Sequence, residues 1–144
     1  MTEGNKKSEV SLRSLLTPSK TVSIDYPEYS GFTIDLCYLA REELVKLRNR
    51  CVTQKLNKKT RGFEEMLDDE KFLTEYTKAV IKGWKGLKVK YLQKMVLIDA
   101  GSLDPETELP FSLENAELLM QNSTGFDQWV TETTQDLENF TMLK

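Results

Sequence analysis

Residues 109–140 read LPFSLENAELLMQNSTGFDQWVTETTQDLENF, and this stretch decides the fold. Ser112 is a good helix N-cap, because its hydroxyl can accept a hydrogen bond from a backbone N–H of the first turn. The negative charge of Glu114 suits the positive end of the helix dipole. Apolar residues then recur at helical spacing: Leu113, Ala116, Leu119 and Met120. The polar run 122–125 breaks the pattern, so we predict a short helix that ends in a tight break.

A second helix is predicted after this break. Its apolar face consists of Phe126, Trp129, Val130, Thr133, Leu137 and Phe140, and acidic residues lie off that face. Neither helix carries a group suited to catalysis. The pair therefore predicts a surface that packs or binds.

The N-terminal region changes to a period of two. Val22, Ile24 and Tyr26 alternate with polar residues before a Pro/Gly turn at 27–31. Phe32, Ile34, Leu36 and Tyr38 alternate in the same way after it. This pattern predicts a β-hairpin with one buried face.

The middle of the chain predicts further helices. Residues 41–55 fit a helix whose inward face is Leu44, Leu47 and Cys51, followed by a basic loop at 57–62. Asp68 is a plausible N-cap for a helix that runs to about Lys82 and ends at Gly83 and Gly86. Its face is Phe72, Leu73, Tyr76, Val80 and Trp84. We expect a strand or extended loop at 87–99 and an acidic loop at 100–108.

These elements predict an α+β fold. An N-terminal β-hairpin packs on a mainly helical domain of four to five helices, which together form one domain over residues 20–144. Residues 1–19 are polar, and Leu12, Leu15 and Leu16 alone bury too little surface to fix a helix in water. We therefore expect a flexible N-terminal arm, either mobile or docked on a partner, that ends at Pro18 and is dispensable for folding.

Charge is distributed unevenly along the chain. Residues 1–98 hold 19 Lys/Arg and 13 Asp/Glu, or +6, and residues 99–144 hold one Lys and ten acids, or −9. Such asymmetry fits either solvated faces or contact between unlike ends of neighbouring copies. We expect a weak homo-oligomer.

The composition predicts neither catalysis nor metal binding, and it predicts no membrane-spanning segment. The chain has no histidine, which is the commonest general base and metal ligand. Cys37 and Cys51 do not have a metal-binding spacing and are expected to be buried thiols. We predict no enzyme, no catalytic residue, no cofactor and no metal. With no long apolar run, no membrane segment is expected.

The basic loop at 57–62 is a candidate for binding nucleic acid. It contains Lys58, Lys59 and Arg61 and follows Lys55, but Phe63 is the only ring nearby. Binding to a nucleic acid strand would favour a longer charged stripe with stacking aromatics. A solvated or partner-facing loop is the better interpretation, and we predict no nucleic-acid partner.

Seven residues are candidates for a partner-binding surface: Trp84, Leu87, Phe111, Leu119, Phe126, Trp129 and Phe140. An aromatic stripe is core more often than interface, so which of them bind stays open. Trp84 and Phe111 sit beside breakers, where a ring can be left half exposed, and Trp is favoured at binding hot spots.

Three short motifs, taken in order, resemble the tail assembly chaperones of long-tailed, siphovirus-type bacteriophages. They are Trp84 to Leu87 ("W-x-G-L"), Leu109 to Leu119 ("LPFS-x-ENA-x-LL") and Phe126 to Phe140. The resemblance implies a protein of the infected host's cytoplasm that binds the tape measure protein. It keeps that protein soluble while tail tube subunits polymerise around it, and it is absent from the mature virion. A frameshifted longer form would recruit the major tail tube protein.

Two other functions remain open from the sequence. One is a small phage regulator associated with nucleic acid, which salt-dependent DNA binding would support. The other is a structural tail-completion protein, which presence in purified virions would support.

Overall fold

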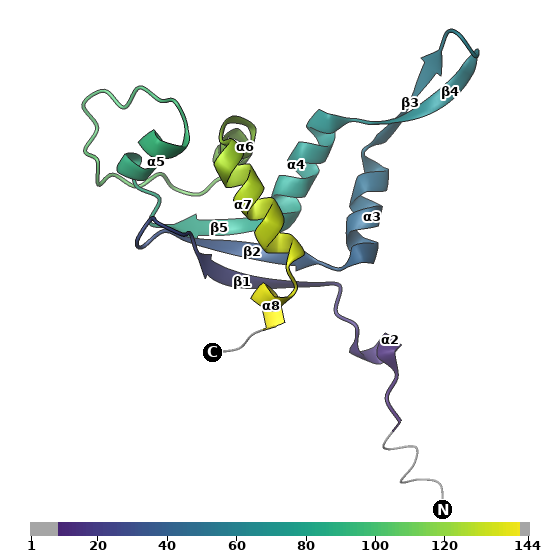
Figure 1. Ribbon diagram of the computed structural model, residues 1–144, viewed down its shortest axis with the longest axis horizontal. Coiled ribbons are helices and arrows are strands. Elements are labelled where there is room, and N and C mark those ends of the chain that lie inside the picture. Colours follow the sequence, from purple (N-terminus) through teal and green to yellow (C-terminus); the bar gives the residue numbers. More distant parts are fainter. Residues whose placement is uncertain (1–8, 142–144) are drawn as a thin grey trace, which may run out of the picture.

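The computed structural model describes residues 9–141, and its central sheet begins with the predicted hairpin (Figure 1). β1 (Ser19–Asp25) and β2 (Thr33–Leu39) pair antiparallel in unbroken register from Ser19↔Leu39 to Asp25↔Thr33. Phe32, Ile34 and Leu36 are completely buried. These observations confirm a hairpin with one buried face.

A third strand, β5 (Ile81–Lys85), completes the sheet in the order β1-β2-β5. We predicted that a helix would run to Lys82, but α4 (Asp69–Val80) ends two residues earlier and leads directly into β5. The buried apolar residues at 80, 81 and 84 are compatible in the sequence with a continuing helix and with a strand. Pairing with the free edge of β2 decides between them, because it satisfies backbone groups that a helix end would leave open.

The next difference is a second hairpin. α3 (Arg41–Arg50) is shorter than the predicted helix over 41–55, and β3 (Val52–Asn57) and β4 (Gly62–Leu67) follow it as a separate two-stranded sheet. This hairpin projects from the body (Figure 1). The predicted basic loop is its turn, where the Asn57 side chain accepts from the backbone N–H of Lys59 at 2.9 Å. Cross-strand pairing of residues 52–57 with 62–67 overrides a weak helical pattern.

α4, α6 (Leu113–Asn122) and α7 (Thr124–Gln135) lie on one side of the sheet (Figure 1). The side chains of Asp68 and Ser112 accept from the backbone N–H groups of Lys71 and Asn115 at 3.1 and 3.0 Å, which confirms both predicted N-caps. The second C-terminal helix is not continuous to residue 140. α7 ends at Gln135, a short α8 (Glu138–Thr141) follows, and Leu137 is exposed.

Two short helices complete the described chain. α2 (Leu12–Leu15) precedes the sheet, and α5 (Val89–Met95) stands where we predicted a strand or extended loop. The alternation at Leu87, Val89 and Tyr91 spans too few residues to exclude a helix. The fold class is α+β, as predicted. The division into an arm at 1–19 and a domain at 20–144 stays a prediction, and residues 1–8 lie outside the described part.

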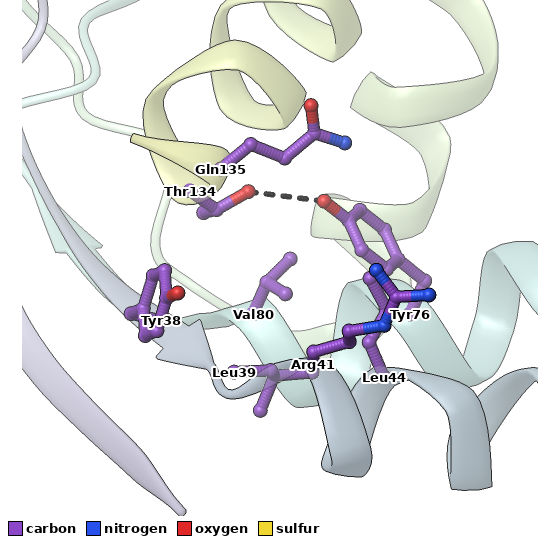
Figure 2. Close-up of a pocket in the computed structure, with 8 residues that line it drawn as sticks. All are labelled: Tyr38, Leu39, Arg41, Leu44, Tyr76, Val80, Thr134 and Gln135. Atoms are coloured by element: carbon purple, nitrogen blue, oxygen red, sulfur yellow. Dashed lines mark hydrogen bonds between the residues drawn. The ribbon is translucent and has the colours of Figure 1, made fainter. Parts of the chain in front are cut away.

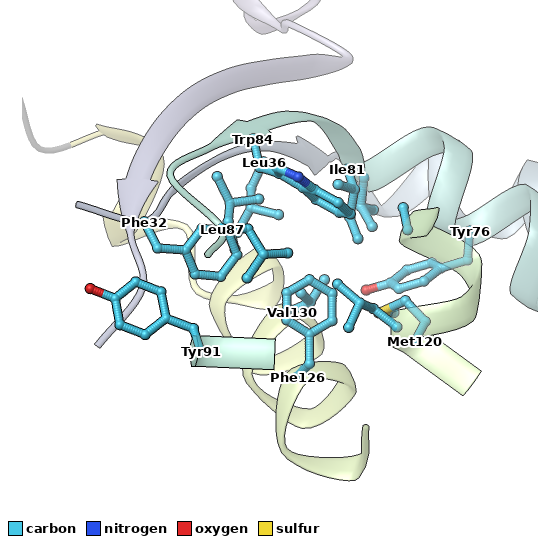
Figure 3. Packing of buried hydrophobic residues seen from close by; sticks show 14 of the residues in the cluster. Phe32, Leu36, Tyr76, Ile81, Trp84, Leu87, Tyr91, Met120, Phe126 and Val130 are labelled. Atoms are coloured by element: carbon cyan, nitrogen blue, oxygen red, sulfur yellow. The ribbon is translucent and has the colours of Figure 1, made fainter. Parts of the chain in front are cut away.

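The core fills the space between the sheet and the helices (Figure 3). Phe126 is completely buried, and its ring lies 6.0 Å from that of Tyr26 on the hairpin turn. Cys37 and Cys51 are buried free thiols, as expected. The aromatic contacts thus fix α7 against the turn of the first hairpin.

Candidate partner-binding surface

Trp84 was the leading candidate for a half-exposed binding residue, and the structure places it in the interior. Its side chain is 8% exposed, and the indole Nε1–H donates to the carbonyl of Leu109 at 2.9 Å. The ring stands edge-on to Phe111, with centroids 5.1 Å apart. The expected half exposure of Trp84 is therefore wrong, because the 109–111 segment folds over the ring.

Leu87 belongs to the same arrangement. It is completely buried, and its carbonyl accepts from the backbone N–H of Leu109 at 2.7 Å. Gly86 has a φ of +78°, and a Cβ there would collide with the carbonyl oxygen of Gly31. Residues 84–87 and 109–111 thus form a closed joint, which we call the seam. Two of the phage-like motifs meet in it.

The other five candidates divide between the core and its margin. Leu119, Phe126 and Phe140 are buried. Trp129 is half-buried, and its ring lies 4.7 Å from that of Tyr26. Phe111 is likewise half-buried against Trp84. The structure therefore does not bring the seven candidates together on one open face.

An open apolar surface lies instead between α3, α4 and α7. Two adjoining cavities of about 230 and 420 Å³ share Leu44, Tyr76 and Gln135. Half-buried Phe72 and Leu73 of α4 line the larger one, and Tyr38, Leu39 and Val80 line the smaller one (Figure 2). We call this surface the trough: α4 forms its floor, and α3 and α7 form its walls.

A buried hydrogen-bond chain fixes the floor of the trough. The Tyr76 hydroxyl lies 3.0 Å from Thr134 Oγ1 (Figure 2). Thr134 Oγ1 donates in turn to the carbonyl of Val130 at 2.8 Å. Tyr76 therefore donates to Thr134. Burial raises the pKa of Tyr76 above its ordinary value of 10, so the ring stays neutral at physiological pH. This chain holds Tyr76 in one orientation between α4 and α7.

The two walls of the trough carry opposite charges. Arg41 and Arg48 line it from α3, while Asp69 and Asp127 line it from the start of α4 and from α7. Within residues 9–141 none of these four side chains forms an ion pair. The trough therefore offers an apolar floor between a cationic and an anionic wall.

Sequence reasoning assigned the trough residues to inward helix faces. Leu44, Phe72, Leu73 and Tyr76 were all expected to be core, and only Tyr76 is fully buried. One feature of the sequence could have indicated the trough: the adjacent residues Phe72 and Leu73 make the apolar face of α4 wider than one neighbouring helix can cover. α3 contributes only one buried residue, Leu47, and so leaves this wide face partly uncovered.

No group of three or more Cys, Asp or Glu within residues 9–141 is arranged to hold a metal ion. Over the same range, no helix has both the length and the apolar character needed to cross a membrane.

Comparison with known proteins places the chain in a phage-related family. The model of the family described as YdaY prophage protein matches residues 40–142. The chain belongs to the YdaY prophage protein family. The match includes α3, α4 and α7, so all three helices of the trough are part of the YdaY region. Neither the curated proteins nor the solved structures provide a match.

Proposed function

We propose that this YdaY-family protein is a phage tail assembly chaperone that holds a helical segment of the tape measure protein in the trough. The observation that carries the proposal is the open apolar lining of the trough, formed by Leu44 on one wall and by Phe72, Leu73 and Tyr76 on the floor. An amphipathic helix binds such a groove through residues spaced three and four apart. Membership of a prophage family and the motif resemblance support the same role.

The dimensions of the trough suit a few turns of a partner helix. α4 has 12 residues, and at 1.5 Å per residue it is about 18 Å long, or roughly three turns. The charged walls favour a partner with acidic residues on one flank of its apolar stripe and basic residues on the other. A tape measure protein of the resembled family is a long helix with an apolar stripe, so it offers many such segments.

The shallow floor supports reversible binding. Phe72 and Leu73 are already half-buried in the free protein, so a partner gains only the remaining area. Many copies along one rod can hold it by avidity, and tube subunits can still displace each copy. In this proposal the protein acts in the host cytoplasm, leaves before the virion is complete and has no catalytic role. A frameshifted longer form would recruit the tail tube protein.

Co-expression with the tape measure protein of the same prophage tests the proposal. Wild-type protein should raise the soluble fraction of the tape measure protein several-fold. Leu44→Gln should remove most of this gain, because Leu44 lines both cavities of the trough. Val45→Gln is the matched control: Val45 is the next residue on α3, is 46% exposed and does not line the trough.

Each outcome of this experiment is informative. If the wild type leaves the tape measure protein insoluble, the chaperone role is wrong. If Leu44→Gln protects it as well as Val45→Gln does, the role stands and the trough is not the site. Detection of the protein in purified virions would favour a tail-completion protein.

One feature favours a second function, the nucleic-acid-associated regulator. The β3–β4 hairpin presents Lys58, Lys59 and Arg61 at its exposed turn, with Phe63 71% exposed beside them. A two-stranded ribbon can enter the DNA major groove. Tight duplex binding that weakens steeply with salt, and that Lys58→Glu with Lys59→Glu abolishes, would establish this function instead.

A further inference from the structure

A second apolar groove lies away from the trough. It runs between α5, the extended segment 96–98 and α6, and it has a volume of about 360 Å³. Its lining residues are Leu92, Val96, Leu97, Ile98, Leu109, Asn115, Leu118, Leu119 and Asn122. Leu97 is fully exposed and Leu118 is 48% exposed. We call it the α5–α6 groove, and it shares no lining residue with the trough.

The α6 side of the α5–α6 groove is acidic, whereas α5 carries Lys90 and Lys94. Residues 95–122 contain six Asp or Glu and no Lys or Arg. Glu114 precedes Leu118 by four residues on α6, so the two share one helix face. Asp99 directly follows Ile98 and is exposed. An occupant of this groove should therefore be apolar on one face and basic on the flank that faces α6.

The chain itself carries a segment of this kind. In α2 and at its C-cap, Leu12, Leu15 and Leu16 are 70%, 62% and 65% exposed, and every residue from 9 to 20 is exposed. The three leucines have the i, i+3, i+4 spacing of one helix face, which forms if the helical turn extends by one residue to Leu16. Residues 1–20 hold four Lys or Arg against two Glu. A four-residue helix is too short to be stable alone, so contact with a partner would stabilise it.

The same chain's groove is out of reach of this segment. Pro18 is tied to the Ser19 end of the sheet, where its carbonyl accepts from the backbone N–H of Ala40 at 2.9 Å. The groove lies beyond the other end of β1, where Asp25 pairs with Thr33 and Thr33 pairs with Lys85 of β5. Figure 1 shows α2 and α5 at opposite ends of the molecule.

The lengths decide against a contact within one chain. Six strand steps from Ser19 to Asp25 cover about 20 Å. The two residues from Leu16 to Pro18 span roughly 7 Å when extended, and the helical turn of α2 adds about 5 Å. The leucine face of α2 therefore stops short of its own groove while β1 stays paired.

We propose that α2 of one copy docks into the α5–α6 groove of a second copy, so that the protein assembles head to tail. Leu12, Leu15 and Leu16 cover Leu97 and Leu118, and Arg13 lies against the acidic α6 side. A row of docked copies then has a free α2 at one end and a free groove at the other, so further copies can add at either end. The trough stays open in every copy, so the inference does not depend on the proposed chaperone function.

Sedimentation velocity at low salt over a concentration series tests this assembly. Wild-type protein should form species larger than a monomer, and their proportion should grow with concentration and fall with salt. The double variant Leu15→Ser/Leu16→Ser should be monomeric, because it lacks the docking face. Leu118→Lys should also be monomeric, because it places a cation in the groove. Val45→Lys, a matched exposed change on α3, should assemble like the wild type.

Mixing the two defective variants gives the decisive result. The α2 variant keeps a functional groove, and the groove variant keeps a functional α2. An equimolar mixture should therefore form a one-to-one heterodimer that grows no further. A monomeric wild type, normal assembly of the α2 variant, or a mixture that stays monomeric would each overturn the proposal. If Leu118→Lys lowers the melting temperature, Leu97→Lys replaces it, since Leu97 is fully exposed.

Discussion

The seam and the trough use the same kinds of residue in opposite ways. In the seam, the Trp84 indole donates to the Leu109 carbonyl, and Leu87 is completely buried. In the trough, Phe72 stacks on Tyr76 with centroids 5.5 Å apart and yet stays half-buried. The seam closes because the 109–111 segment returns over β5. The trough stays open because α3 and α7 do not meet above α4.

This contrast separates stability from binding. Substitutions in the seam and in the core beside it should cost free energy of unfolding. Substitutions of the half-buried trough residues Leu44, Phe72 and Leu73 should cost less stability and should act on the partner.

Phe126→Ala should have the largest effect. Phe126 is completely buried and packs near Tyr26, so truncation should lower the free energy of unfolding by about 3–5 kcal/mol. Phe72→Ala in the trough is the matched control and should cost less than half as much, since its ring is only half-buried. Chemical denaturation of both variants measures the difference, and equal losses would remove the distinction between core and trough.

Trp84→Phe tests the seam directly. The change removes the indole N–H and leaves the Leu109 carbonyl without that donor, which should cost about 1–3 kcal/mol of stability. Urea denaturation measures the loss. If Trp84→Phe leaves stability unchanged and weakens binding of the tape measure protein, Trp84 has the binding role that the sequence predicted and not a structural one.

The sequence predicted the local elements better than their exposure. Period-two alternation located β1 and β2, and the caps at Asp68 and Ser112 located α4 and α6. These features are set by neighbours a few residues away. The second hairpin and β5 were missed, because residues 52–57 and 81–85 become strands only through their partners.

The candidate site was less predictable for the same reason. The half exposure expected of Trp84 failed because Leu109, 25 residues later, covers the ring. Leu44 and Phe72 were assigned to the core, since a helical stripe shows which side faces inward and not whether a neighbour covers it. Exposure is a property of the tertiary arrangement of α3, α4 and α7, which no local pattern contains.

Thr77→Val should stabilise the protein by about 1 kcal/mol. Thr77 is completely buried on α4, and its hydroxyl has no hydrogen-bond partner among the described residues. Thr134→Val is the matched control and should destabilise instead, because the Thr134 hydroxyl bonds both Tyr76 and the Val130 carbonyl. Melting temperatures that move in the same direction for both variants would contradict the hydrogen-bond assignment.

The smallest effect is expected at Glu106, in the loop that follows α5. Its carboxylate oxygens lie 2.7 Å from the Nζ atoms of Lys88 and Lys90, and hydrogen bonds from these two groups lower the pKa of Glu106 from 4.5 to about 2. A carboxyl group with a depressed pKa in the folded state adds stability above its unfolded pKa and loses it as the pH falls. The contribution of Glu106 should therefore be complete above about pH 5 and should disappear toward pH 2. Because the group is exposed, salt should weaken it further. NMR titration of Glu106 gives its midpoint, and a midpoint near 4.5 would show that the Lys88 and Lys90 contacts do not persist in solution. Glu106→Gln should then match the wild type in stability at every pH, and α5 would be held by its buried side chains and by the backbone hydrogen bonds from Val89 and Lys90 to the 105–107 segment.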